Sequence, residues 1–242
     1  MDITLDSIRD INLYQSKSGY RFSVDSLLLY NFVNLKKVIN IADLGAGSGI
    51  VGILLAKKYH DANITLFELQ DSLISLAKKN VAKNYLEDRV KVIKCDLRTL
   101  PFLYLSPFNY DLVVSNPPFR KLKSGLLNLE EEKAIARHEV KLKLNELINT
   151  ASHLLNIKGR FCLIYHPYRL SELMEVLKKR GLEPKRLRFV HSNISSEAKM
   201  ILIEAVKKGK VGLKVDKPLY IYNENRSYTD EVKNIYNSGA KV

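Results

Sequence analysis

The hydrophobic positions of the chain alternate between short apolar runs and longer segments with a single apolar face. The short runs, which are rich in β-branched residues, predict strands at 38–44, 64–69, 90–95, 112–114 and 159–166. Between most of them, apolar positions recur with the helical period. This alternation indicates βαβ units, and therefore an α/β protein with a doubly wound, mostly parallel sheet of the Rossmann-like type. Two last strands, at 187–191 and 200–206, are joined by a short polar link and are predicted to pair antiparallel.

Two segments flank this predicted core of residues 38–206. Residues 1–37 begin with a polar stretch of weak periodicity and end in a predicted helix through Leu27 and Phe32. Residues 207–242 form a lysine-rich extension with a predicted edge strand at 219–222 and a loosely ordered end. No repeat or linker divides the sequence, so we expect a single domain over 1–242.

Composition places the chain among ordinary globular proteins, with 46% hydrophobic and 27% charged residues. No apolar run approaches the ~20 residues that a membrane helix needs, and the N-terminus lacks the pattern of a signal peptide. The two cysteines, Cys95 and Cys162, lie in strand-like runs, which predicts buried free thiols and a reducing compartment. We therefore expect a cytoplasmic protein that does not bind a membrane.

The formal net charge of +13 is unevenly distributed. Residues 1–120 carry a balance of +3, whereas residues 121–242 carry +10. A basic second half suggests a polyanionic partner whose phosphates supply salt-sensitive affinity. Ordinary lysine-rich solvation explains the same numbers, and charge alone does not decide between the two.

The most informative stretch of the sequence is Asn116-Pro117-Pro118-Phe119, directly after the fourth strand. Two successive prolines end the strand and stiffen the corner. In open α/β sheets, ligands bind just outside the carboxyl ends of the strands. An amide, a proline carbonyl and an aromatic ring at that place suit a planar group that bears an NH₂. The alternative is a structural turn that closes a strand over a core phenylalanine.

A glycine-rich turn follows the first predicted strand, with Gly45, Gly47 and Gly49 between that strand and a helix. Glycines allow a tight turn and a close approach of the backbone to a ligand. The segment 47–52 also matches the dinucleotide fingerprint, so NAD has to be considered. Asp43 favours S-adenosyl-L-methionine instead, because its charge suits the cationic amino-acid part of that cofactor and repels a pyrophosphate.

Two further acidic residues follow the next strands. Glu68 is placed to accept hydrogen bonds from both ribose hydroxyls, which NAD and S-adenosyl-L-methionine would use alike. Asp96 is placed to accept a hydrogen bond from the adenine amino group of a cofactor. It could equally well cap a helix. No cluster of Cys and His has the spacing of a metal site, so we expect no metal.

Together these residues carry a family resemblance. Residues 43–49, Glu68, Asp96 and the Asn-Pro-Pro-Phe corner resemble the seven-stranded S-adenosyl-L-methionine-dependent methyltransferases that modify exocyclic or amide nitrogens. Three further stretches, within 15–25, 136–139 and 166–170, resemble the bacterial valine-tRNA adenine-N6 methyltransferases. That family more often has Tyr at the position of Phe119, a change that keeps stacking and removes a hydroxyl.

The resemblance implies a seven-stranded sheet with an antiparallel last strand, S-adenosyl-L-homocysteine as product, and tRNA as the substrate. It implies Asn116, Pro117, Pro118 and Phe119 as catalytic residues. It also implies a cofactor site that includes Asn116 and the residues Phe22, Asp25, Asp43, Gly45, Ala46, Gly47, Gly49, Glu68, Leu69, Asp96 and Leu97. Basic residues near the corner or on later strands are candidates for RNA contacts: Arg120, Lys121, Lys123, Arg186 and Arg188.

The chemistry expected of the corner needs no strong base. Hydrogen bonds from both N–H groups of the adenine N6 to acceptors at the corner make this nitrogen more nucleophilic. An aromatic ring stacked on the base aligns N6 with the methyl group. A base in an anticodon loop is already single-stranded, so bringing it to the corner costs less than flipping a base out of a duplex.

Other functions share parts of this pattern. Protein glutamine N5-methylation and ribosomal-RNA guanine-N2 methylation use the same corner and stay open. A DNA adenine methyltransferase is disfavoured, because no segment is long enough for a target-recognition domain. A non-catalytic RNA-binding protein and an NAD-dependent oxidoreductase are more remote. The oligomeric state is left open by the sequence, with a monomer favoured.

Overall fold

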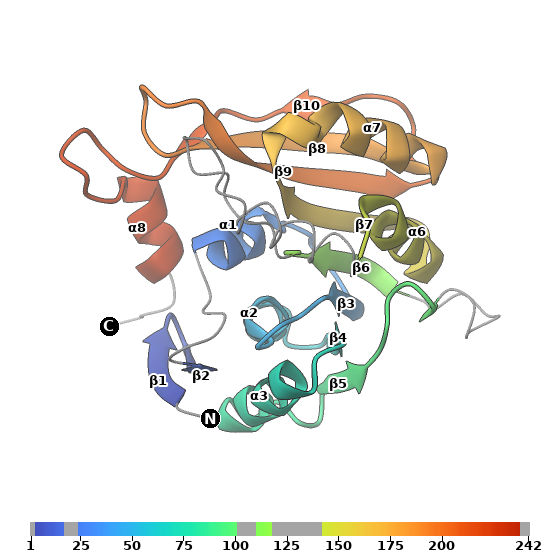
Figure 1. Cartoon of the computed structure of the whole chain (residues 1–242), viewed down its shortest axis with the longest axis vertical. Coiled ribbons are helices and arrows are strands. Elements are labelled where there is room, and N and C mark those ends of the chain that lie inside the picture. Colours follow the sequence, from blue (N-terminus) through green and yellow to red (C-terminus); the bar gives the residue numbers. More distant parts are fainter. Residues whose placement is uncertain (1–2, 17–23, 101–109, 118–141, 238–242) are drawn as a thin grey trace, which may run out of the picture.

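The computed structural model describes residues 3–16, 24–100, 110–117 and 142–237. Its centre is a nine-stranded sheet in the order β10-β8-β9-β7-β6-β3-β4-β5, with β11 beside β8 (Figure 1). The seven main strands are β3 (Asn40–Leu44), β4 (Asn63–Glu68), β5 (Val90–Lys94), β6 (Tyr110–Ser115), β7 (Leu155–Tyr165), β8 (Leu182–His191) and β9 (Ala198–Lys207).

The strand directions confirm the predicted doubly wound sheet. Strands β5, β4, β3, β6 and β7 pair in parallel, whereas β9 is antiparallel to both of its neighbours, β7 and β8. Two short strands, β10 (Lys214–Val215) and β11 (Leu219–Tyr220), extend the sheet by pairing in parallel with β8. The carboxyl ends of the parallel strands therefore form one common edge, called the carboxyl edge below.

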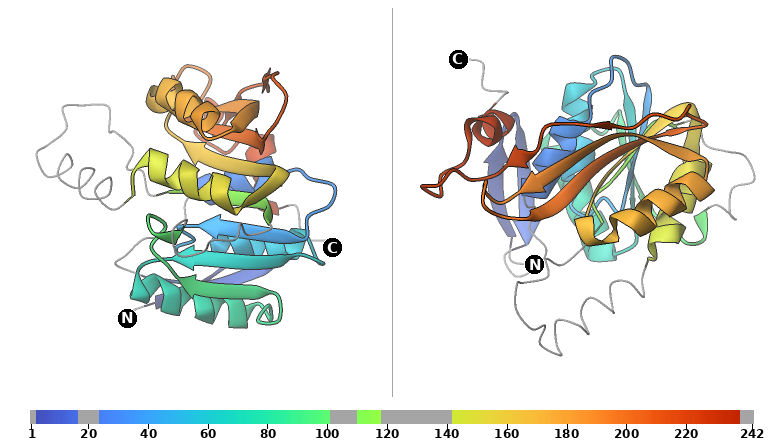
Figure 2. Two further views of the ribbon diagram at one scale, coloured as in Figure 1. Left: turned by 90° about the vertical axis from the view of Figure 1, so that its right-hand side faces the viewer. Right: turned by 90° about the horizontal axis from the view of Figure 1, so that it is seen from above.

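Helices cover both faces of the sheet, as Figure 2 shows. On one face, buried side chains of α1 (Val24–Phe32), α2 (Ile50–Lys58), α3 (Asp71–Lys83) and α8 (Asp230–Asn237) form one hydrophobic cluster. On the other face, α6 (Leu144–Leu154) and α7 (Leu170–Lys179) form a second cluster. The short 3-10 helix η1 (Pro167–Arg169) links β7 to α7. This sandwich leaves the two strand edges as the places where polar side chains gather.

The N-terminal segment contains structure that the hydrophobic pattern did not predict. Strands β1 (Ile3–Ile8) and β2 (Ile11–Ser16) form an antiparallel hairpin. Two asparagines of the α3 region hold it: Asn84 Oδ1 accepts from the Asn12 N–H at 3.0 Å, and Asn80 Nδ2 donates to the Tyr14 carbonyl at 3.1 Å. Side-chain amides thus replace a neighbouring strand along β2, which is why strand periodicity alone misses the attachment.

The C-terminal extension is also more ordered than the sequence suggested. Its predicted edge strand is present as the short β11, and α8 stands where a loose end was expected. Val232 and Ile235 of α8 are buried, and the helix lies beside α1 (Figure 1). Cys95 and Cys162 are buried free thiols, as predicted. Within the described ranges, every helix is too short or too polar to cross a bilayer.

Candidate active site

The end of β6 lies beside the glycine turn that follows β3. Asp43 of β3 is paired with Val114 of β6, so continuing the register places Asn116 next to Gly45. The Ser115 hydroxyl donates to the Leu44 carbonyl at 2.7 Å and fastens the two strand ends together. Asn116 and Pro117 are half-buried at this point of the carboxyl edge. The two motifs that the sequence singled out are therefore neighbours.

A hydrogen bond to helix α1 holds the Asn116 side-chain amide. Its Nδ2 donates to the Ser26 hydroxyl oxygen at 3.1 Å, and Ser26 itself is buried. This bond directs the NH₂ end of the amide toward α1 and turns Oδ1 away from it. An oriented carbonyl oxygen at a strand end is the acceptor that recognition of an NH₂ group requires.

The glycine turn keeps its backbone open toward the carboxyl edge. Gly45 has a φ of +70°, and no atom outside the adjoining residues lies within 4 Å of the place where a Cβ would stand. Gly49, at the start of α2, has a φ of +86°, a left-handed conformation that favours glycine. Space beside a bare backbone is what a ligand needs to approach the turn closely.

Asp43 is buried below this turn and is unusual for a carboxyl group. Its Oδ2 accepts a hydrogen bond from the Gly52 N–H at 3.0 Å. Burial, with a smaller contribution from the charge of Glu68, raises the pKa of Asp43 to about 7, although the Gly52 hydrogen bond opposes the change. A carboxyl group with such a pKa is only partly ionised at neutral pH. A cation bound close to it would favour the charged form.

Glu68 organises the turn from the neighbouring strand β4. Its Oε2 accepts from the Gly47 N–H at 2.9 Å, and its Oε1 accepts from the Leu69 and Gln70 N–H groups at 2.8 and 2.9 Å. A carboxylate offers about four acceptor positions, so these bonds leave capacity for a further donor. Glu68 thus lies at the expected place and already supports the turn.

Asp96 forms the turn after β5. Its Oδ1 accepts from the Arg98 backbone N–H at 3.0 Å, and the Arg98 side chain forms an ion pair with it at 2.5 Å. These hydrogen bonds and the charge of Arg98 lower the pKa of Asp96. The capping role that the sequence allowed is therefore present. Its neighbour Leu97 is buried, and Leu69, after β4, is 39% exposed at the same edge.

Two buried polar atoms, one in α1 and one in the glycine turn, have no hydrogen-bond partner in the described part of the chain. They are Oδ1 of Asp25, at the start of α1, and the hydroxyl of Ser48, within the turn. Unsatisfied buried polar groups are costly, and they recur at binding sites where a ligand completes them. Ala46, in the same turn as Ser48, is also buried.

Several predicted site residues lie outside the described residues. These are Phe22, Pro118, Phe119, Arg120, Lys121 and Lys123. Their assignment continues to rest on the sequence.

The other two residues predicted to contact RNA, Arg186 and Arg188, form intramolecular contacts. Arg188 forms an ion pair with Glu231 of α8 at 2.7 Å and donates to the Lys217 carbonyl. Arg186 lies over the Phe32 ring, 3.9 Å from its centroid, and close to buried Glu204. Both guanidinium groups therefore attach the C-terminal extension and α1 to the sheet, and this disfavours them as RNA contacts.

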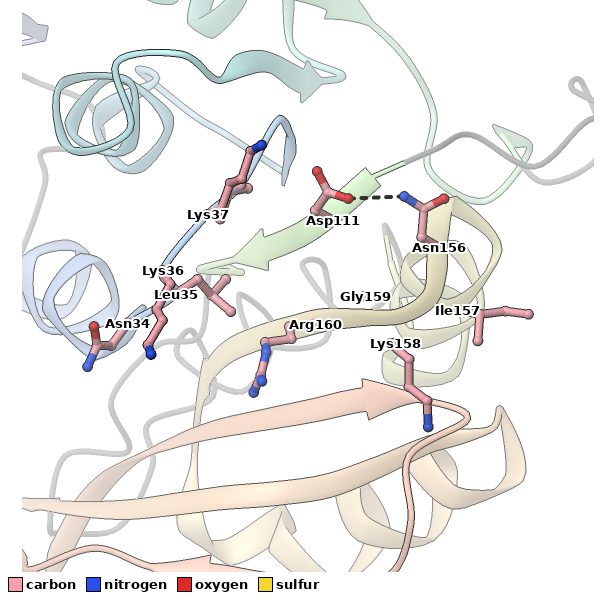
Figure 3. Close-up of a pocket in the computed structure, with 11 residues that line it drawn as sticks. Asn34, Leu35, Lys36, Lys37, Asp111, Asn156, Ile157, Lys158, Gly159 and Arg160 are labelled. Atoms are coloured by element: carbon pink, nitrogen blue, oxygen red, sulfur yellow. Dashed lines mark hydrogen bonds between the residues drawn. The ribbon is translucent and has the colours of Figure 1, made fainter.

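A groove lies at the opposite edge of the sheet, among the amino ends of β3, β6 and β7. Figure 3 shows its lining, which includes Lys36, Lys37, Lys158 and Arg160. Asp111 in its wall accepts hydrogen bonds from the Asn156 amide at 3.1 Å and from the backbone N–H groups of Ile39 and Asn40. The groove is about 1000 Å³, and neither Asn116 nor Pro117, the two predicted catalytic residues that the structure describes, lines it. Its size does not make it the active site.

Comparison with known proteins bears on the family of this chain. The model of the methyltransferase small domain matches residues 21–179. A Porphyromonas gingivalis protein named tRNA1(Val) (adenine(37)-N6)-methyltransferase is 30% identical over 210 residues, which cover 84% of this chain and 81% of the relative. A Bacteroides thetaiotaomicron protein of the same name is 29% identical over 195 residues, covering 74% and 79%.

The chain belongs to this methyltransferase family.

Solved structures agree on the fold of this family member. A predicted O-methyltransferase from Agrobacterium tumefaciens superposes with a TM-score of 0.70 at 22% identity, covering 89% of this chain and 96% of the other. A Pyrococcus horikoshii protein, TYW2, solved in complex with MeSAdo, superposes with a TM-score of 0.60 at 13% identity, covering 86% and 72%. These likenesses confirm the Rossmann-like methyltransferase fold.

S-adenosyl-L-methionine is the cofactor of this methyltransferase, and the NAD alternative falls away. The residues present fit that cofactor. The space beside Gly45 leaves room for a ligand, the carboxyl group of Asp43 would pair with the cationic part of the cofactor, and the unsatisfied oxygens of Asp25 and Ser48 could accept hydrogen bonds from it. No group of three or more His, Cys, Asp or Glu in the described ranges is arranged to hold a metal.

Sequence reasoning missed two site features. Ser26 sits inside an apolar helical run, so nothing local marks it as a partner of Asn116, 90 positions later. Asn80 donates to the Ser48 carbonyl at 2.9 Å and supports the glycine turn from α3. Both contacts depend on tertiary packing. An asparagine on the apolar face of a predicted helix was the one available signal.

Proposed function

We propose that this protein transfers a methyl group from S-adenosyl-L-methionine to the exocyclic N6 of an adenosine in tRNA. The names of the curated relatives point to adenine 37 of tRNA1(Val) as the specific target. The observation that carries the proposal is the position of Asn116, beside the glycine turn and with its amide oriented by Ser26. An acceptor held there is suited to an amino group that must meet a methyl donor.

The proposed chemistry addresses the weak nucleophilicity of N6. Its lone pair is delocalised into the adenine ring, so the nitrogen attacks poorly in the planar form. Oδ1 of Asn116 and the Pro117 carbonyl accept hydrogen bonds from the two N6–H groups and stabilise the positive charge that develops in the transition state. Phe119 stacks on the base and aligns N6 for in-line attack. After transfer, the methylated ammonium is acidic enough to release its proton to water.

The remaining residues divide between holding the cofactor and holding the corner. The bound cofactor supplies the electrophilic methyl group. Asp43 pairs with its cationic amino-acid part, and the free acceptor capacity of Glu68 receives its ribose hydroxyls. Asp96 receives the adenine amino group of the cofactor beside its contact with Arg98. Asp25 and Phe22 close the site from the N-terminal side.

The RNA side of the proposal rests on charge and on the place of the corner in the chain. Residues 121–242 carry a balance of +10. Arg120, Lys121 and Lys123 directly follow the corner and contact the phosphates on either side of the target base. We place the enzyme in the cytoplasm, where tRNA is available to it, and expect it to act as a monomer with residues 1–242 forming one domain.

A substrate competition tests this function. The purified full chain is incubated with methyl-labelled cofactor and equal masses of unmodified total tRNA, ribosomal RNA and ribosome-free protein. We expect label in tRNA, and we expect it to disappear when adenine 37 of a valine tRNA transcript is replaced by guanine. Label in protein or ribosomal RNA instead would overturn the proposal in favour of glutamine or guanine methylation.

A further inference from the structure

Beyond the Asn116 corner, the carboxyl edge presents exposed aromatic rings on strands that the proposed chemistry does not use. Tyr168 lies in η1, directly after β7, and is 61% exposed. Tyr222 follows β11 and is 39% exposed. Two exposed rings at the same edge of the sheet offer surfaces on which bases of a bound RNA can stack.

The sheet register places the end of β7, which leads into η1, next to the end of β6. Ser115 of β6 is paired with Leu163 of β7, so the ends of these parallel strands lie side by side. Adjacent strands are separated by about 5 Å, which brings η1 within reach of nucleotides that neighbour a base bound at Asn116.

Tyr168 is also held in a defined orientation. Pro167 occupies the first turn of η1 and fixes its entry. The Tyr168 ring packs against the buried His166 ring, with centroids 5.4 Å apart. One side of the tyrosine is thus supported by the protein while most of its surface stays open. A ring fixed in this way loses little conformational freedom when a base stacks on it.

Tyr222 extends the same edge on the far side of β8. β11 is paired with the end of β8, and the Tyr222 N–H donates to the Ser192 carbonyl at 2.8 Å. Its ring stacks on Tyr228 with an interplanar angle of 13°, and Tyr228 stacks on Tyr236 of α8 at 21°. The exposed ring is therefore the outer member of a rigid stack. Four strand spacings separate it from β6, or about 20 Å.

We propose that Tyr168 and Tyr222 form an aromatic rim that binds unpaired bases of the RNA on one side of the target adenine. Single-stranded nucleic acid is typically bound by rings on which successive bases stack, next to cations that contact the backbone. Tyr168 holds the base nearest the target, and Tyr222 holds one further along the loop. The inference rests on the proposed function, because it assigns a role to side chains beyond the reacting base.

The test measures tRNA binding by the full chain saturated with S-adenosyl-L-homocysteine. Tyr168→Ala should weaken binding on the order of 10-fold to 100-fold, the range for loss of one base–aromatic stack, and Tyr168→Phe should restore it. Tyr222→Ala should weaken binding less. Tyr85→Ala is the matched control, since Tyr85 is 89% exposed but lies between α3 and β5, near the amino edge.

A second readout separates stacking from a structural role. In tRNA carrying 2-aminopurine next to the target, stacking on Tyr168 should quench fluorescence on binding, and Tyr168→Ala should abolish the quenching while the salt dependence of binding stays unchanged. The melting temperature and cofactor affinity of each variant confirm folding. Binding and quenching equal to those of Tyr85→Ala would overturn the rim. Failure of the wild type to methylate tRNA would instead overturn the proposed function.

Discussion

The Nδ2 atom of Asn116 donates to the Ser26 hydroxyl oxygen 3.1 Å away, joining the end of β6 to the first turn of α1. The bond fixes which end of the amide faces the ligand side. It also connects the end of β6 to the helix that carries Asp25 in its first turn. The acceptor that we propose for the amino group is thus positioned by the first turn of α1.

Removing the amide should stop catalysis and leave the cofactor site intact. Asn116→Ala should lower kcat by about 100-fold to 1000-fold, the usual cost of losing one transition-state hydrogen-bonding group. Ser26→Ala should lower kcat less, because the amide remains but loses its orientation. Asn63→Ala, at the exposed amino end of β4, is the control. Single-turnover methylation and S-adenosyl-L-homocysteine titration measure the two effects. A normal kcat in Asn116→Ala removes this residue from the mechanism.

Asp43 should make the stability of the cofactor-free protein depend on pH. Its pKa rises from 3.8 to about 7 on folding. A raised carboxyl pKa means that the folded state favours the protonated form, so stability is full below pH 4 and is lost as the pH rises through 7. Asp43→Asn removes this loss. The melting temperature of the variant minus that of the wild type should therefore increase as the pH rises from 4 to 7. The affinity of the variant for the cofactor should fall by about 10-fold or more.

Asp61→Asn provides the comparison for Asp43, because Asp61 is exposed in the turn before β4. Its melting curve should follow that of the wild type across the same pH range. A constant difference between Asp43→Asn and the wild type from pH 4 to 7 would show that Asp43 is already ionised in the folded protein.

Gly52 should not tolerate alanine, although it lies in a helix where alanine is normally favourable by about 1 kcal/mol. A Cβ at this position would stand 2.2 Å from Leu66 Cδ2 and 3.4 Å from Asp43 Oδ2. Because Leu66 is fully buried, the overpacking should cost about 1–3 kcal/mol and exceed the helical gain. Chemical denaturation of Gly52→Ala measures the balance. An increase in its free energy of unfolding contradicts the packing described around the turn.

Neutralising Arg120, Lys121 and Lys123 together should weaken tRNA binding and reduce its dependence on salt. Each lost phosphate contact lowers the slope of log affinity against log salt by about 0.7–0.9. The matched control is Lys36→Gln, Lys37→Gln and Lys158→Gln, three lysines of the groove at the amino edge. That control should keep the wild-type slope. Equal slopes for both triple variants would move the RNA path away from the corner.

The sheet was predictable from sequence because strand and helix periods alternate cleanly between 38 and 206. Each buried strand, such as β6 with Leu112 and Val113, is a short apolar run with an evident end. The hairpin β1–β2 was not predictable, since its outer edge is satisfied by Asn80 and Asn84 and not by a strand. Helix α8 escaped for a similar reason: two apolar side chains, Val232 and Ile235, suffice once α1 lies beside them.

The candidate site shows the same division. Asp43, Glu68 and Asn116 were identified from their places at strand ends, and the parallel register brings those ends together. The sequence did not reveal which charged side chains form ion pairs with one another in the folded protein. Arg186 and Arg188 appear in a basic run, yet their partners Glu204 and Glu231 come from distant segments. Pairing of this kind is settled by tertiary contacts alone.

The most direct test of the account is the identity of the nucleoside that this enzyme produces. An unmodified valine tRNA transcript is methylated with labelled cofactor, digested to nucleosides and analysed by chromatography with mass spectrometry, for the wild type and for Asn116→Ala. The account predicts label in N6-methyladenosine with the wild type and none with the variant. Label in N2-methylguanosine, or N6-methyladenosine formed equally well by Asn116→Ala, would contradict it.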